Sequence, residues 1–106
     1  MAYQKGEYGK IVVIDLAYDL SLATALTLTI SRPDGSSIQK TTSDGLQVGG
    51  QDLVVDGVTY NANQYATYTT AAGDIDQAGD YSLQLSAQFG ANQLLKSPIQ
   101  LMVVGE

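Results

Sequence analysis

The chain has 106 residues and a net charge of −6, and 44% of its residues are hydrophobic. Five scattered basic residues are too few to bind nucleic acid or an anionic membrane surface. The absence of Cys and His excludes disulfides, thiol nucleophiles, histidine-based catalytic arrangements and the common zinc sites. We therefore expect one soluble domain with no cofactor, no metal, and neither nucleic acid nor membrane as a partner.

Residues 1–9 are mostly polar and hold two tyrosines, Tyr3 and Tyr8, which stand near Gly6 and Gly9. Such a segment has no core of its own and gains order only by lying on another surface. We predict a short N-terminal arm that docks to a partner, followed by a single domain over residues 10–106.

Residues 11–14 form the continuous apolar run Ile-Val-Val-Ile. Branched residues in such a run predict a strand that is covered on both faces. Either the strand pairs with another subunit, or it is a first strand that crosses between two sheets of its own domain; we favour the second. Residues 19–24 are expected to form a loop with one helical turn at most.

Two hairpins follow from the pattern and the turn residues. Residues 25–32 alternate apolar and polar side chains, the Pro33-Asp34-Gly35 step supplies a turn, and residues 36–42 return as a polar strand. Asp56-Gly57 lies between two β-prone triplets, which favours a two-residue type I′ hairpin.

Tyr65 and Tyr68 lie on a further predicted strand, residues 64–70, and are three positions apart. Side chains at this spacing point to opposite faces of a strand. We expect one ring to enter the core. The other is either an ordinary exposed strand tyrosine, which we favour slightly, or lies on a partner-facing surface, where tyrosine combines an apolar ring with a polar tip.

Residues 81–89 alternate strictly between apolar and polar side chains, after a turn rich in Asp and Gly. Asp76, Gly79 and Tyr81 are typical of the tyrosine corner of immunoglobulin-like sandwiches, in which the tyrosine hydroxyl binds an upstream backbone group. Asp74, Asp76 and Asp80 could also bind calcium, but they lack the spacing of an EF-hand loop, so we interpret them as turn residues.

Short strands with turn signals about every ten residues, and no long helical pattern, predict an all-β fold. We expect an immunoglobulin-like antiparallel β-sandwich of about seven or eight short strands. No paired carboxylates, no Ser with a base and no phosphate-binding loop are evident, so we do not expect an enzyme.

Several segments together resemble small immunoglobulin-like structural proteins of tailed bacteriophages. They are Gly-x-Ile-Val-Val-Ile-Asp-Leu at 9–16, Asp-Leu-Ser-Leu-Ala-Thr at 19–24, Arg-Pro-Asp-Gly at 32–35 and the Asp/Gly turn leading into Tyr81. The chain is similar in particular to the N-terminal domain of phage baseplate upper proteins and to related neck, fibre and decoration proteins. It departs from the usual corner in having Gln77 where Asp is common.

The resemblance implies a non-enzymatic virion protein, present in many copies with the symmetry of the tail, neck or capsid to which it docks, and assembled in the host cytoplasm. One alternative is a carbohydrate- or cell-surface-binding module in which Tyr60, Tyr65 and Tyr68 stack on sugar rings. Another is a fragment of a bacterial surface or periplasmic array.

Overall fold

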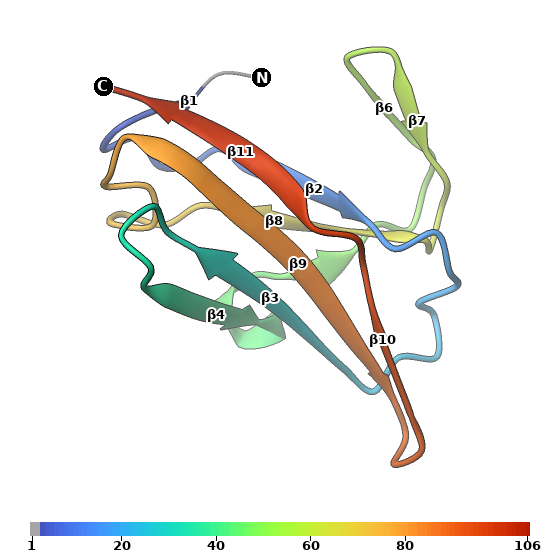
Figure 1. The fold of residues 1–106 in the computed structure, drawn as a ribbon. Coiled ribbons are helices and arrows are strands. Elements are labelled where there is room, and N and C mark those ends of the chain that lie inside the picture. Colours follow the sequence, from blue (N-terminus) through green and yellow to red (C-terminus); the bar gives the residue numbers. More distant parts are fainter. Residues whose placement is uncertain (1–2) are drawn as a thin grey trace.

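The computed structural model describes residues 3–106, which form a sandwich of two β-sheets measuring 39 × 31 × 22 Å (Figure 1). The predicted all-β fold is confirmed. In these residues the only helical element is the short 3₁₀ turn η1 (Thr42–Asp44). The described residues form eleven strands, more than the seven or eight expected; two of them, β1 and β5, have only two residues and leave no periodic signal in the sequence.

The larger sheet has six strands in the order β1-β11-β9-β3-β4, with β10 also paired to β9. The long strand β9 is central, since it pairs with β11 and β10 on one side and with β3 on the other, and its strict alternation gives it one apolar and one polar face. Every pairing is antiparallel except that of β1 with β11, which is parallel. The strands are β1 (Tyr3–Gln4), β3 (Ala25–Ser31), β4 (Ser37–Thr41), β9 (Gly79–Phe89), β10 (Gln93–Lys96) and β11 (Gln100–Gly105).

The smaller sheet has three antiparallel strands in the order β2-β8-β5. A separate two-stranded ribbon, β6–β7, belongs to neither sheet and projects from one end of the sandwich (Figure 1). The strands of the smaller sheet and the ribbon are β2 (Ile11–Asp15), β5 (Gln47–Val48), β6 (Leu53–Val55), β7 (Val58–Tyr60) and β8 (Tyr65–Thr69).

The core lies between the two sheets and is built from alternate residues of their strands. The smaller sheet contributes Val12 and Ile14 from β2, and Ala66 and Tyr68 from β8. The larger sheet contributes the apolar residues that the alternation of β3 and β9 predicts to face inward. Phe89, at the end of β9, is half-buried against the core, and the others are buried. These are Leu26, Leu28, Ile30, Tyr81, Leu83, Leu85 and Ala87.

Both predicted hairpins form. Thr27 pairs with Thr41 and Ser31 with Ser37 in the β3–β4 hairpin. In the β6–β7 ribbon, Asp56 has φ 52° and Gly57 has φ 81°, the two positive values that a type I′ turn requires. No helical turn forms over residues 19–24, which are a loop.

The expectation that residues 11–14 are covered on both faces is wrong. Burial alternates along β2, with Val12 and Ile14 buried and Ile11 58% exposed. The reason is that β2 lies at the edge of the smaller sheet, whose outer side carries no further layer there. The chain does cross between the two sheets of its own domain near the N-terminus. The crossing lies between β1, in the larger sheet, and β2, in the smaller sheet, and not within the apolar run.

The described part of the predicted arm, residues 3–9, lies on the sandwich; residues 1–2 are outside the described residues. Tyr3 is buried in the core, and the backbone N–H groups of Lys5, Gly6 and Gly9 donate to the carbonyls of Gly105, Ile75 and Thr70 at 2.7–2.8 Å. The segment is therefore tied to its own domain by strand pairing and by backbone hydrogen bonds.

Candidate docking surfaces

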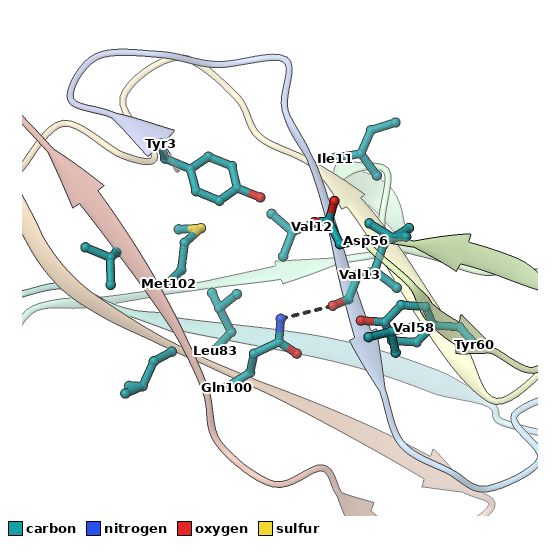
Figure 2. Close-up of a pocket in the computed structure, with 13 residues that line it drawn as sticks. Tyr3, Ile11, Val12, Val13, Asp56, Val58, Tyr60, Leu83, Gln100 and Met102 are labelled. Atoms are coloured by element: carbon teal, nitrogen blue, oxygen red, sulfur yellow. Dashed lines mark hydrogen bonds between the residues drawn. The ribbon is translucent and has the colours of Figure 1, made fainter. Parts of the chain in front are cut away.

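A cleft of about 390 Å³ opens along the side of the sandwich where β2 and β11 face each other (Figure 2). The β6–β7 ribbon forms a third wall. We call this feature the edge cleft. Its lining residues are Tyr3, Ile11, Val12, Val13, Val55, Asp56, Val58, Tyr60, Leu83, Gln100, Leu101, Met102 and Val103.

The floor of the edge cleft is apolar and its rim is apolar and exposed. Val12, Leu83 and Met102 are almost fully buried core residues that reach its floor. The rim exposes between 52% and 67% of four large side chains, which are Ile11, Val58, Leu101 and Val103. Apolar side chains gathered around a hollow are typical of a site of interaction.

The two strands that border the edge cleft are bridged by a single side chain. The Nε2 group of Gln100 on β11 donates a hydrogen bond to the carbonyl oxygen of Val13 on β2 at 3.2 Å, drawn as the dashed line in Figure 2. Gln100 pairs with Leu83 and so faces the sandwich interior at the open side. This polar bridge partly closes the opening between the sheets.

The polar groups in the edge cleft include Asp56 and the hydroxyl of Tyr3, which points toward the ribbon (Figure 2). Burial raises the pKa of the Tyr3 hydroxyl, and the negative charge of Asp56 raises it further. Tyr3 therefore stays neutral at physiological pH and can donate a hydrogen bond inside the cleft, while Asp56 supplies a negative charge at its wall.

The outer face of the larger sheet is a second exposed surface, polar but without charge over its centre. Apart from the Ala25–Gln88 pair at one end, the residues that pair across β9, β3 and β4 on this face are all Ser, Thr or Gln. They are Thr27, Thr29, Ser31, Ser37, Gln39, Thr41, Ser82, Gln84 and Ser86. A further hollow of about 630 Å³ lies between the loop of residues 20–26 and residues 42–48, and it is lined by Leu20, Leu26 and Leu46.

Three of the four tyrosines expected to dock to a partner, Tyr3, Tyr65 and Tyr68, are buried against their own chain. Tyr65 and Tyr68 do point to opposite faces of β8, with Tyr68 in the core. The outer ring, that of Tyr65, is covered by the loop after β5, and its hydroxyl donates to the carbonyl of Gln51 at 2.6 Å. Of the four predicted docking tyrosines, Tyr8 alone exposes most of its ring, 65%.

At the turn into β9, Tyr81 is fully buried and its hydroxyl accepts a hydrogen bond from the backbone N–H of Gln77 at 3.1 Å. Gly79 has φ 130°, and its Cα faces Pro33, so that a Cβ there would lie 3.0 Å from the proline ring. Asp76 points outward, 4.0 Å from the Nε of Arg32. The turn is thus attached both to the core and to the β3–β4 hairpin.

A buried polar network that the sequence did not predict lies below this turn. Asp74, only 4% exposed, accepts hydrogen bonds from the Tyr68 hydroxyl and from the backbone N–H of Ala71, and it pairs with the ammonium group of Lys40 at 3.2 Å. Asp74 and Lys40 are 34 positions apart, and no local spacing signals their contact. The Asp74 carboxylate is thus occupied by hydrogen bonds and an ion pair within the chain. Within residues 3–106, no three or more potential metal ligands lie close enough together to hold a metal ion.

Comparison of the chain with protein-family models, with curated proteins and with solved structures finds no match. Among residues 3–106 there is no helix whose length and hydropathy would let it cross a membrane.

Proposed function

We propose that this protein is a non-enzymatic structural component of a bacteriophage virion, in a tail, baseplate, neck, fibre-anchoring or decoration position, where it binds other virion proteins. The phage assignment is supported by residues 9–16, 19–24 and 32–35 and by the Asp/Gly turn before Tyr81, which together resemble that family. We further propose that many copies are arranged by the symmetry of the virion platform.

The order of the strands supports an immunoglobulin-like assignment. In that scheme one sheet holds strands B, E and D, and the other holds G, F, C and C′. The sheet β2-β8-β5 and the run β11-β9-β3-β4 follow the same order. Tyr81, at the start of β9 after the turn from β8, then stands where the tyrosine corner occurs, and its bond to Gln77 agrees with that geometry.

The single observation that carries a binding role is the edge cleft. Its rim gathers four of the ten exposed large hydrophobic side chains of the described residues, Ile11, Val58, Leu101 and Val103, around one hollow. Burying such a rim against a partner would be favourable by roughly 25 cal/mol for each Å² of apolar surface removed from water. Side chains that could act together as nucleophile and base do not line it: its ionisable groups are Asp56 and two tyrosines.

The carbohydrate-binding alternative has less support. It needs exposed aromatic rings on one surface, and two of its three tyrosines, Tyr65 and Tyr68, are buried. The third, Tyr60, is partly buried and its ring packs on that of Tyr65 with centroids 5.9 Å apart. A glycan array with no hits and tight binding to purified virion protein would agree with the docking proposal.

The test is electron microscopy of particles made with and without the gene for this chain. We expect the mutant particles to lack a defined density at the tail, neck or capsid surface, and we expect the wild-type gene to restore it. Mutant particles with all densities in place would overturn the virion assignment.

A further inference from the structure

We propose that the free edge of β2 accepts an extended segment of a partner protein as an additional β-strand, which fills the edge cleft. The segment would have apolar side chains at alternate positions and a Lys or Arg beside Asp56. This inference deepens the proposed docking function but does not depend on the partner being a virion protein.

The backbone of β2 carries the first part of the argument. The carbonyl of Lys10 accepts from Thr70 and the N–H of Leu16 donates to Gln64, so even-numbered residues direct their backbone groups toward β8 and the loops at its ends. The direction of the backbone N–H and C=O groups alternates along a strand. The backbone groups of Ile11, Val13 and Asp15 therefore point away from β8. Gln100 bonds the carbonyl of Val13 from that side, which agrees with this direction.

No described strand pairs with this side of β2, since the smaller sheet ends there. An unpaired row of N–H and C=O groups is a template for another extended chain. Main-chain hydrogen bonds would supply affinity in such strand addition, and pockets for alternate side chains would supply specificity. The five residues of β2 would span about 17 Å, at about 3.3 Å for each residue.

The cleft determines which side chains the segment needs. A strand added beside β2 would direct every second side chain toward the sandwich interior, where Val12, Leu83 and Met102 form the floor. These positions require apolar side chains, because no charged residue lines that floor. Gln100 would give up its bond to Val13 and could bond the added backbone instead.

Charge decides between a foreign partner and a second copy of this chain. Asp56 lines the cleft and Asp15 ends β2, and neither is in an ion pair within the described residues. Lys10, at the other end, pairs with Glu7 at 3.6 Å. A second copy would bring the same acids and a further net charge of −6 to the contact. A segment that carries Lys or Arg would complement the edge instead.

The test uses the full chain and the synthetic peptide Lys-Val-Thr-Val-Thr-Val-Lys in excess, followed by backbone NMR and amide hydrogen exchange. We expect chemical-shift changes along β2, β11 and the β6–β7 ribbon, and slower exchange of the amides of Ile11, Val13 and Asp15. A control peptide with glutamate in place of both lysines should bind more weakly, and a peptide with proline at the central valine should not bind.

Two variants address the edge directly. Val13→Pro removes an N–H that points away from β8, so it should leave the fold intact and weaken peptide binding about tenfold or more. Val13→Thr, which keeps the N–H, is its matched control. Asp56→Asn keeps a residue suited to the type I′ turn and removes the charge, and it should weaken binding about twofold to fivefold with less salt dependence.

Three results would overturn the proposal: no binding of the lysine peptide, protection of β4 instead of β2, or a dimer of the free protein through β2. Equal binding by Val13→Pro and Val13→Thr would also overturn it. These measurements on purified protein are independent of the particle experiment, so the edge site and the virion assignment can fail separately.

Discussion

The aromatic ring of Tyr65 lies directly on the backbone of Gly49, so closely that a Cβ atom on this glycine would be 2.0 Å from the ring carbon Cζ. The N–H of Gly49 donates to the carbonyl of Tyr65 at 3.0 Å, and the Tyr65 hydroxyl donates to Gln51 at 2.6 Å. These three contacts fasten the loop after β5 over the outer face of β8. They explain why Tyr65 is buried although it faces away from the core.

Replacement of Gly49 by alanine should therefore be destabilising, because the ring and its hydroxyl bond must be displaced. We expect a loss of about 1–3 kcal/mol in the free energy of unfolding, measured by urea denaturation. Gly50→Ala is the matched control and should change little, since nothing lies within 4 Å of a Cβ at that position. Equal effects of the two substitutions would contradict the proposed contact.

Removal of the Tyr81 hydroxyl should also lower stability. In Tyr81→Phe the N–H of Gln77 loses its acceptor at a part-buried site, and we expect a cost of about 1 kcal/mol. Tyr8→Phe changes the same group on an exposed ring and should have no measurable effect. Thermal and urea unfolding of the two variants measure the difference, and an unchanged midpoint for Tyr81→Phe would count against the bond.

The substitution Asp74→Asn should have the largest effect among the polar changes. It removes the charge that Lys40 pairs with in a site where only 19% of the lysine side chain is exposed. Breaking one side of a buried pair leaves an uncompensated charge, and we expect a loss of about 3 kcal/mol. Asp76→Asn is the control, because Asp76 is 56% exposed and 4.0 Å from Arg32; there the loss should stay below about 1 kcal/mol.

Stability should fall in alkaline solution. Burial raises the pKa of the Tyr68 hydroxyl above its ordinary 10.0, and Asp74 raises it further. For Lys40, burial lowers the pKa, but the hydrogen bonds and charges of Asp74 and Tyr68 outweigh this and raise it above 10.5. A group whose pKa is higher in the folded than in the unfolded state stabilises the fold fully at pH values below its unfolded pKa. This contribution is lost as the pH rises through its folded pKa.

We therefore expect the free energy of unfolding to decline as pH increases above 10, as followed by urea denaturation at a series of pH values. Tyr68→Phe should remove the tyrosine part of this decline. A variant with the same slope as the wild type would show that Tyr68 does not contribute to it.

The carboxyl of Asp34 should titrate in unusually acidic solution. Hydrogen bonds from the Ser36 hydroxyl, the Ser36 backbone N–H and the side chain of Gln77 lower its pKa from 3.8 to about 2. The hydrogen-bonded carboxylate of Asp34 stabilises the fold fully at pH values above its unfolded pKa, and this contribution is lost as the pH falls toward 2. NMR titration of the side-chain carboxyl measures this. Ser36→Ala should return the pKa toward 3.8, whereas an Asp34 that already titrates there in the wild type would refute the bonding.

The sequence predicted those features of the fold that depend on local backbone conformation, namely tight turns and the direction of side chains along a strand. Asp56-Gly57 requires two positive φ values wherever it forms a tight hairpin, so the β6–β7 ribbon followed from two residues. The alternation of residues 81–89 likewise predicted which side chains of β9 face inward, because side-chain direction in a strand has a period of two.

Features that depend on distant segments were missed. The apolar run at 11–14 does not indicate that Ile11 stays exposed, because this depends on its pointing from the outer face of the smaller sheet. Burial of Tyr65 depends on Gly49, and the charge of Asp74, in the turn before β9, is balanced by Lys40 on β4. The edge cleft joins β2, β11 and the ribbon, which are far apart in sequence, so no motif could have located it.

The parallel pairing of Tyr3 with Val104 has a practical consequence for engineering. The first and last described strands lie side by side (Figure 1), so a linker long enough to reverse direction could join the chain ends. New termini could then be opened at the exposed tip around Gly90 and Asn92, which would give a circular permutant of the same domain.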